Sequence, residues 1–98
     1  MKTIHKVMLE PQPGVTQVQT PKGAHFLTAQ MMGPGIALWF HCDTEAEVVD
    51  RNIMLAWTGT SVAIPMTRLN YIATVQNGPL VYHVMEVTVM PPQVQDGD

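Results

Sequence analysis

The single serine and the single cysteine of this sequence are the first candidates for covalent catalysis. Ser61 follows Gly59-Thr60 and lacks the flanking glycines of a hydrolase nucleophile elbow, so we interpret it as part of a turn. Cys42 follows His41 directly, and neighbouring residues in a strand point to opposite faces, so the two cannot form a nucleophile–base pair. We therefore expect no nucleophilic catalysis, with Cys42 as a small buried apolar residue.

The histidines and carboxylates do not match a known metal or acid–base pattern. Each histidine falls in a different predicted strand, and no spacing among them is typical of zinc binding; they are His5, His25, His41 and His83. Most carboxylates lie in one polar stretch that indicates a solvated loop; the candidates are Glu10, Asp43, Glu45, Glu47, Asp50 and Glu86. The sequence therefore predicts no metal, no cofactor and no enzymatic activity.

Aromatic residues, together with arginine and threonine side chains, suit a flat, polar ligand. Aromatic rings stack on nucleobases, and guanidinium groups bind phosphates through paired hydrogen bonds. The clearest local feature is the placement of Arg51 and Trp57 on one face of a predicted strand. His83 is either a hydrogen-bonded core residue or a ligand contact. The candidate ligand-binding residues are Trp39, Arg51, Trp57, Thr58, Gly59, Thr60, Arg68, Tyr71 and His83.

Size and composition limit the class of protein. The 98 residues are enough for one domain. Because 46% of the residues are hydrophobic and only 13% are charged, we expect exposed apolar patches, which usually mark interfaces. The composition therefore predicts a homo-oligomer.

Charge and segment lengths limit the partners and the location. The net charge is −3 and the five basic residues are scattered singly, which argues against binding to duplex nucleic acid. A single cysteine allows no intramolecular disulfide, and no run approaches the roughly 18 apolar residues of a membrane span. The first eight residues lack the apolar run of a signal peptide. We expect a cytoplasmic protein with no membrane partner.

Alternating apolar and polar residues, interrupted by proline and glycine, predict an all-β fold. About seven short strands are expected, over residues 2–9, 15–20, 24–32, 36–42, 51–58, 69–76 and 80–88. The stretch 43–49 is expected to be a loop or one helical turn. The architecture is a small antiparallel barrel or sandwich with little or no helix. Residues 1–89 are expected to form a single β domain, and residues 90–98, with nothing to bury, are expected to be disordered.

Two hairpins are expected from turn residues. Gly33-Pro34-Gly35 lies between two strands, which excludes a phosphate-binding loop before a helix. A turn centred on Pro34 pairs Phe26 with Cys42, Thr28 with Phe40 and Gln30 with Leu38. Asn77-Gly78 predicts the second hairpin.

Several short motifs, in this order, resemble a family of small uncharacterised tailed-phage proteins. They are Met1-Lys-Thr-Ile-His-Lys, Pro21-Lys-Gly-Ala24, Leu38-Trp39 followed by Asp43, Arg51-x-Ile53 leading to Thr58-Gly59-Thr60, Tyr71-Ile72-x-Thr74, and Val81-x-His83-Val84-x-Glu86. The resemblance covers about residues 1–87. In that family Gly-His-Pro commonly follows the Gly-Thr pair, whereas this chain has Ser61 to Pro65 there.

The resemblance implies an accessory protein that a phage produces in the cytoplasm of its host. By analogy with other small phage proteins, the leading hypothesis is an oligomer that counteracts host defence by sequestering a small nucleotide-type immune signal. One alternative is an inhibitor that binds a host defence or regulatory protein through the acidic stretch 43–50. Another is a minor structural component of the virion.

Overall fold

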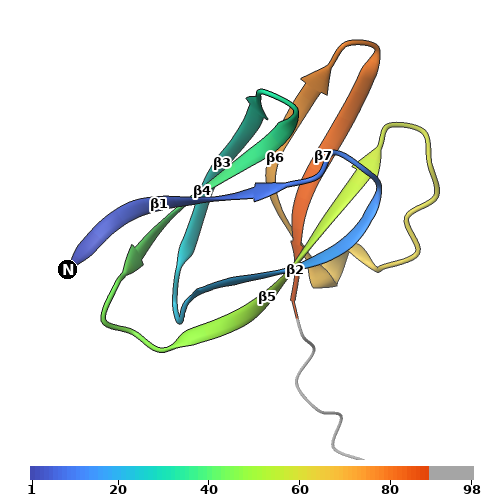
Figure 1. Cartoon of the computed structure of the whole chain (residues 1–98). Helices are drawn as coiled ribbons and strands as arrows, with labels where there is room; N and C mark the ends of the chain where they lie inside the picture. The colour runs from blue at the N-terminus through green and yellow to red at the C-terminus, as the bar shows by residue number, and fades with distance from the viewer. Residues whose placement is uncertain (89–98) are drawn as a thin grey trace, which may run out of the picture.

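The computed structural model describes residues 1–88, which form seven strands and one short 3-10 helix (Figure 1). Every strand pairing is antiparallel. The elements are β1 (Lys2–Leu9), β2 (Gly14–Pro21), β3 (His25–Met32), β4 (Gly35–Asp43), β5 (Val48–Trp57), η1 (Met66–Arg68), β6 (Leu69–Asn77) and β7 (Leu80–Val87). The predicted all-β fold of about seven strands is confirmed. The prediction for residues 90–98 lies outside the described residues.

The strands form two sheets packed as a sandwich. One sheet has the order β1-β4-β3 and the other β2-β5-β7-β6. Alternate residues of each strand point between the sheets, where the largest buried side chains lie. They include Ile36, Leu38, Ile53, Leu55, Tyr82 and Val84. Thr3, His5, Val7 and Leu9 share the inward face of β1, because they pair with the inward residues of β4.

The outer face of the four-stranded sheet holds a second apolar cluster. Its buried members are Met54, Ala56, Leu69, Met85 and Val87. Ile64, in the loop that follows β5, packs over them. Because β5 is covered on both faces, the run from Ile53 to Ala56 is continuously apolar instead of alternating.

Strand β5 begins at Val48, three residues earlier than predicted. Val48 and Val49 pair with Pro21 and Thr20, and β-branched residues favour a strand there. The helical alternative for residues 43–49 is wrong, because Asp43 ends β4 and its carbonyl accepts a turn hydrogen bond from Ala46 N. The backbone N–H of Glu45 donates to the Asp43 carboxylate, which lowers the pKa of that group.

Both predicted hairpins are present, but both turns consist of Gly-Pro. Met32 pairs with Gly35 around Gly33-Pro34, and Asn77 pairs with Leu80 around Gly78-Pro79. Each turn glycine has a positive φ, 60° for Gly33 and 61° for Gly78. Since proline holds the next φ near −65°, these are two-residue turns of type II′.

The predicted register of the first hairpin is therefore wrong. Phe26 pairs with Phe40, Thr28 with Trp39 and Gln30 with Ala37. A two-residue turn shifts the pairing by one position from a turn centred on Pro34. A bulge between Phe26 and Thr28 shifts it by one more.

Replacing Gly78 with alanine should lower the free energy of unfolding by about 1 kcal/mol or more, because an L-residue is strained at a positive φ. Urea denaturation measures the loss. The matched control is a chemically synthesised chain with D-alanine at residue 78, which favours positive φ and should be close to the unmodified chain in stability. Equal losses for the two alanines would contradict the assigned turn.

Candidate functional site

The structure divides the predicted ligand-binding residues among separate places. Trp39 lies on the outer face of the three-stranded sheet, where it pairs with Lys6 and Thr28. Arg68 ends η1, and its Nε lies 3.4 Å from the carbonyl oxygen of Thr88. Trp39 and Arg68 therefore lie apart from the other candidate residues.

Arg51 lies between the two sheets, on the same inward face of β5 as Trp57, as predicted. Its Nε and Nη2 donate to the carboxylate of Glu86 on β7. Its Nη1 donates to the carbonyl oxygen of Ala24 (2.9 Å), and the guanidinium lies 4.5 Å from the centroid of the Phe26 ring. These contacts join β5 and β7 to the start of β3. A phosphate ligand would therefore have to compete with Glu86 for Arg51.

Thr58, Tyr71 and His83 are brought together on the outer face of the four-stranded sheet. With Thr74 they form a hydrogen-bonded set that we call the polar row. Thr58 Oγ1 lies 2.7 Å from His83 Nε2, and Thr74 Oγ1 lies 3.3 Å from His83 Nδ1. The hydroxyl of Tyr71 lies 2.7 Å from Thr74 Oγ1, and this tyrosine is 63% exposed. The polar row thus ends in an aromatic ring that is open to solvent.

Thr74 is the member of the polar row that the sequence did not reveal. In a regular strand, residues 71 and 74 would point to opposite faces. A bulge between Tyr71 and Ala73 adds one residue to β6, which brings Tyr71 and Thr74 to the same face. Only the bulge makes this contact possible.

Trp57 and Thr60 line a hollow of about 410 Å³ at the end of β5. Its walls are the first residues of β2, the last residues of β5 and the loop after β5; they comprise Pro13–Val15, Met54–Trp57 and Thr60–Ile64. Trp57 packs edge-on against Tyr82, with ring centroids 6.2 Å apart. Its indole Nε1 is buried and has no hydrogen-bond partner within residues 1–88.

The loop that closes this hollow begins with a tight turn. The backbone N–H and the hydroxyl of Thr60 both lie within hydrogen-bond distance of the Trp57 carbonyl, at 3.2 and 2.7 Å. Gly59 has a φ of 90°, which this turn requires. Thr58, in the polar row, and Thr60, at the hollow, are therefore separated only by Gly59. Ser61, interpreted from the sequence as a turn residue only, also lines the hollow.

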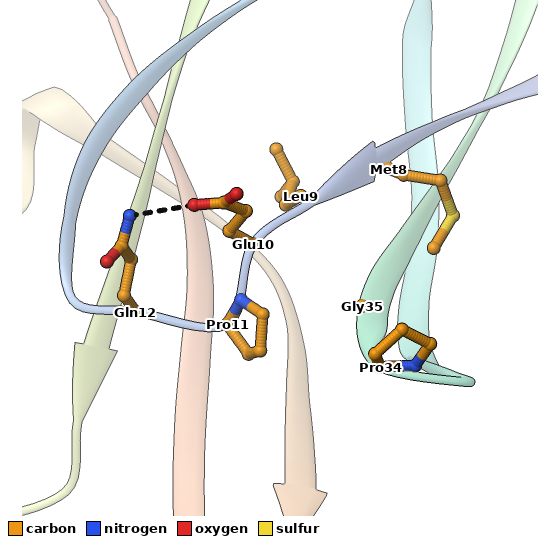
Figure 2. Close-up of a pocket in the computed structure, with 7 residues that line it drawn as sticks. All are labelled: Met8, Leu9, Glu10, Pro11, Gln12, Pro34 and Gly35. Atoms are coloured by element: carbon orange, nitrogen blue, oxygen red, sulfur yellow. Dashed lines mark hydrogen bonds between the residues drawn. The ribbon is translucent and has the colours of Figure 1, made fainter.

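A larger hollow of about 500 Å³ lies at the connection between β1 and β2 (Figure 2). Figure 2 shows Glu10 and Gln12 on one side, joined by a hydrogen bond of 3.1 Å, and Met8 and Pro34 on the other. Its one charged lining residue is the carboxylate of Glu10. This hollow is therefore unsuited to an anionic ligand.

The polar row and the hollow beside Trp57 offer hydrogen bonds and aromatic surface. A threonine hydroxyl next to an imidazole has the spacing of an activated nucleophile. However, both nitrogens of His83 face neutral threonine hydroxyls, so no carboxylate orients the ring as in a catalytic triad. Within the described part of the chain, no group of three histidine, cysteine or acidic side chains is placed to hold a metal ion. The arrangement is best suited to recognition of a polar ligand.

Comparison with known proteins places the chain in a family. A family model described as a domain of unknown function, DUF7352, matches residues 1–94. The chain belongs to this family. No curated protein and no solved structure matches the chain significantly. Within residues 1–88, no helix is long and apolar enough to cross a membrane.

Replacing Arg51 with methionine should lower the free energy of unfolding by about 2 to 4 kcal/mol, because it leaves Glu86 unpaired between the sheets. In the double variant Arg51→Met with Glu86→Leu, the stranded charge is absent, so the loss should be smaller than for Arg51→Met alone. Urea denaturation of Arg51→Met, Glu86→Leu and the double variant tests this. A double variant as unstable as the sum of the single changes would show that the ion pair is not the cause.

Proposed function

We propose that this protein acts by binding and not by catalysis, as an oligomeric phage accessory protein that sequesters a small nucleotide-type immune signal of the host. Two observations on Trp57 carry the ligand site: the residue lines the hollow at the end of β5, and its buried indole Nε1 has no hydrogen-bond partner within residues 1–88. A buried donor without a partner is energetically costly, and a ligand acceptor would remove that cost. The volume of about 410 Å³ is within the range of small-molecule sites.

The surroundings of Trp57 support a ligand that is both flat and polar. Indole rings stack on bases and donate one hydrogen bond, and Trp57 lines the hollow together with two hydroxyl-bearing residues, Thr60 and Ser61. The polar row, which begins at the adjacent Thr58, adds an imidazole and the exposed ring of Tyr71. Bases and sugar hydroxyls fit this combination of groups.

The biological setting of the proposal comes from the resemblance to tailed-phage proteins. Small phage proteins without catalytic groups often counteract host defence by removing a signal molecule. Membership of an uncharacterised family is compatible with this setting.

Fluorescence of single-tryptophan variants tests the ligand site, because the chain has two tryptophans. Trp39→Phe leaves Trp57 as the reporter, and Trp57→Phe leaves Trp39. Titration with cyclic dinucleotides and ADP-ribose derivatives should quench Trp57 and leave Trp39 unchanged. His83→Ala should weaken the affinity by about 2- to 10-fold, the value of one hydrogen bond.

Thermal-shift titration of the unmodified chain provides the control for this experiment. If no nucleotide at millimolar concentration changes either the melting temperature or the fluorescence, the sequestration proposal is wrong. If only Trp39 is quenched, the ligand site is on the other sheet.

A second candidate function is the inhibition of a host protein through the acidic turn between β4 and β5. Glu45, Glu47 and Val48 are exposed, the valine by 64%. Within residues 1–88, neither glutamate takes part in an ion pair. This turn therefore presents two available carboxylates next to an apolar side chain, as a basic partner would require.

Charge reversal at Glu45 and Glu47 should remove a host protein that the unmodified chain retains in a pull-down followed by mass spectrometry. Glu10→Lys, which reverses a charge at the β1–β2 connection, is the matched control and should keep that protein. The same set of retained proteins in all three experiments would exclude a role for the acidic turn.

A further inference from the structure

The two sheets have four edge strands, and three of them carry features that disfavour pairing with another chain. Edges of this kind are commonly protected by bulges, prolines or covering elements. β3 and β6 each contain a bulge and pack against each other across the sandwich. β2 follows Pro13 and ends at Pro21, which has no backbone N–H.

β1 is the exception among these edges. It runs over eight residues in one continuous register with β4, without proline, glycine or bulge (Figure 1, blue). In the described part of the chain, β4 is its only strand partner. Two of its outward side chains are large and apolar, with Ile4 56% and Met8 45% exposed. β1 therefore presents an intact backbone edge flanked by apolar surface.

The backbone groups on the free side of β1 can be identified. Thr44 N donates to the carbonyl oxygen of Met1 (2.9 Å), so Met1 and Thr44 form a hydrogen-bonded pair. Such pairs alternate along an antiparallel ladder. The odd-numbered residues of β1 therefore form backbone hydrogen bonds with β4. The even-numbered residues direct their backbone N–H and C=O groups away from β4, toward the free edge of the sheet. These are Lys2, Ile4, Lys6 and Met8.

The side chains select one register for pairing with a second copy. Lysine on an edge strand opposes pairing when two lysines meet. A two-fold axis at Ile4 would pair Lys2 with Lys6, and an axis at Lys6 would pair that residue with itself. An axis at His5 pairs Lys2 with Met8 and Ile4 with Lys6. In this register all four residues with backbone groups on the free edge form hydrogen bonds with the second copy. The aliphatic part of each lysine side chain then lies beside an apolar side chain.

We propose that the chain dimerises through β1, which pairs antiparallel with β1 of a second copy about a two-fold axis at His5. The three-stranded sheets of the two copies then join into one sheet of six strands. The proposed function leaves the oligomer interface open, and this inference does not depend on the identity of any ligand. Association of the copies and nucleotide binding are measured separately, so either can fail alone.

Opposite charges at one exposed position test the interface. Ile4 lies opposite Lys6 of the second copy, so Ile4→Glu should tighten the dimer and Ile4→Lys should weaken it. Two such pairs form per dimer, so each change should alter the dissociation constant by roughly 2- to 30-fold. Analytical ultracentrifugation over a concentration series measures this constant. Thr28→Glu and Thr28→Lys, on β3 of the same sheet, are the matched controls and should have no effect.

Cross-linking tests the register. At the two-fold axis, the two His5 residues form a non-hydrogen-bonded pair with Cα atoms about 4.5 Å apart, which suits a disulfide. His5→Cys should therefore give a covalent dimer on mild oxidation. Thr3→Cys should not, because Thr3 faces Val7 of the second copy. Both variants carry Cys42→Ala, because Cys42 is the cross-strand partner of Thr3 and would compete for a cysteine introduced there.

A chain that stays monomeric at every concentration would overturn the proposal. This holds also if the free edge of β1 binds a peptide of another protein instead of a second copy. A dimer that responds equally to both charges at residue 4 would overturn it as well. Cross-linking through Thr3→Cys in place of His5→Cys would show that the register is wrong.

Discussion

The interaction on which much of this structure depends is the set of contacts made by the Arg51 guanidinium, because it binds Glu86 in its own sheet and also contacts the start of the other sheet. Arg51 binds Glu86 within its own sheet and reaches Ala24 and Phe26 in the chain leading into the other sheet. An arginine between sheets is costly unless its donors are satisfied, and here each nitrogen has a partner. The sequence pattern predicted that Arg51 binds a ligand. In the structure its guanidinium contacts Glu86 on β7, Ala24 and Phe26, and these contacts link β5 and β7 to β3.

The position of the candidate ligand site follows from the burial of β5 on both faces. The loop after β5 must return over the sheet so that Ile64 covers Met54 and Met85. This path places Thr60 and Ser61 beside Trp57, and it leaves Thr58 next to His83. The need to cover the apolar outer face of β5 thus determines where the polar groups of the candidate ligand site lie.

The low charge content and the unprotected β1 edge are two aspects of one constraint. A chain with few charged residues has few side chains with which to protect a sheet edge. Bulges in β3 and β6 and prolines at the ends of β2 disfavour pairing at three edges. At the fourth edge, β1, the lysines are the features that oppose pairing. Since lysines repel only when they meet, their spacing permits one register and disfavours its neighbours.

The sequence by itself determined the number of strands and their approximate limits, because alternation and chain breakers are local properties. It also placed Arg51 and Trp57 on one face. The tertiary structure decided the hairpin registers, since these depend on the positive φ of Gly33 and Gly78. It also decided the contact of Tyr71 with Thr74, through a bulge that no local pattern indicates. The partner of Arg51 lies 35 residues away in the chain, and only the packing of β5 against β7 brings the two charges together.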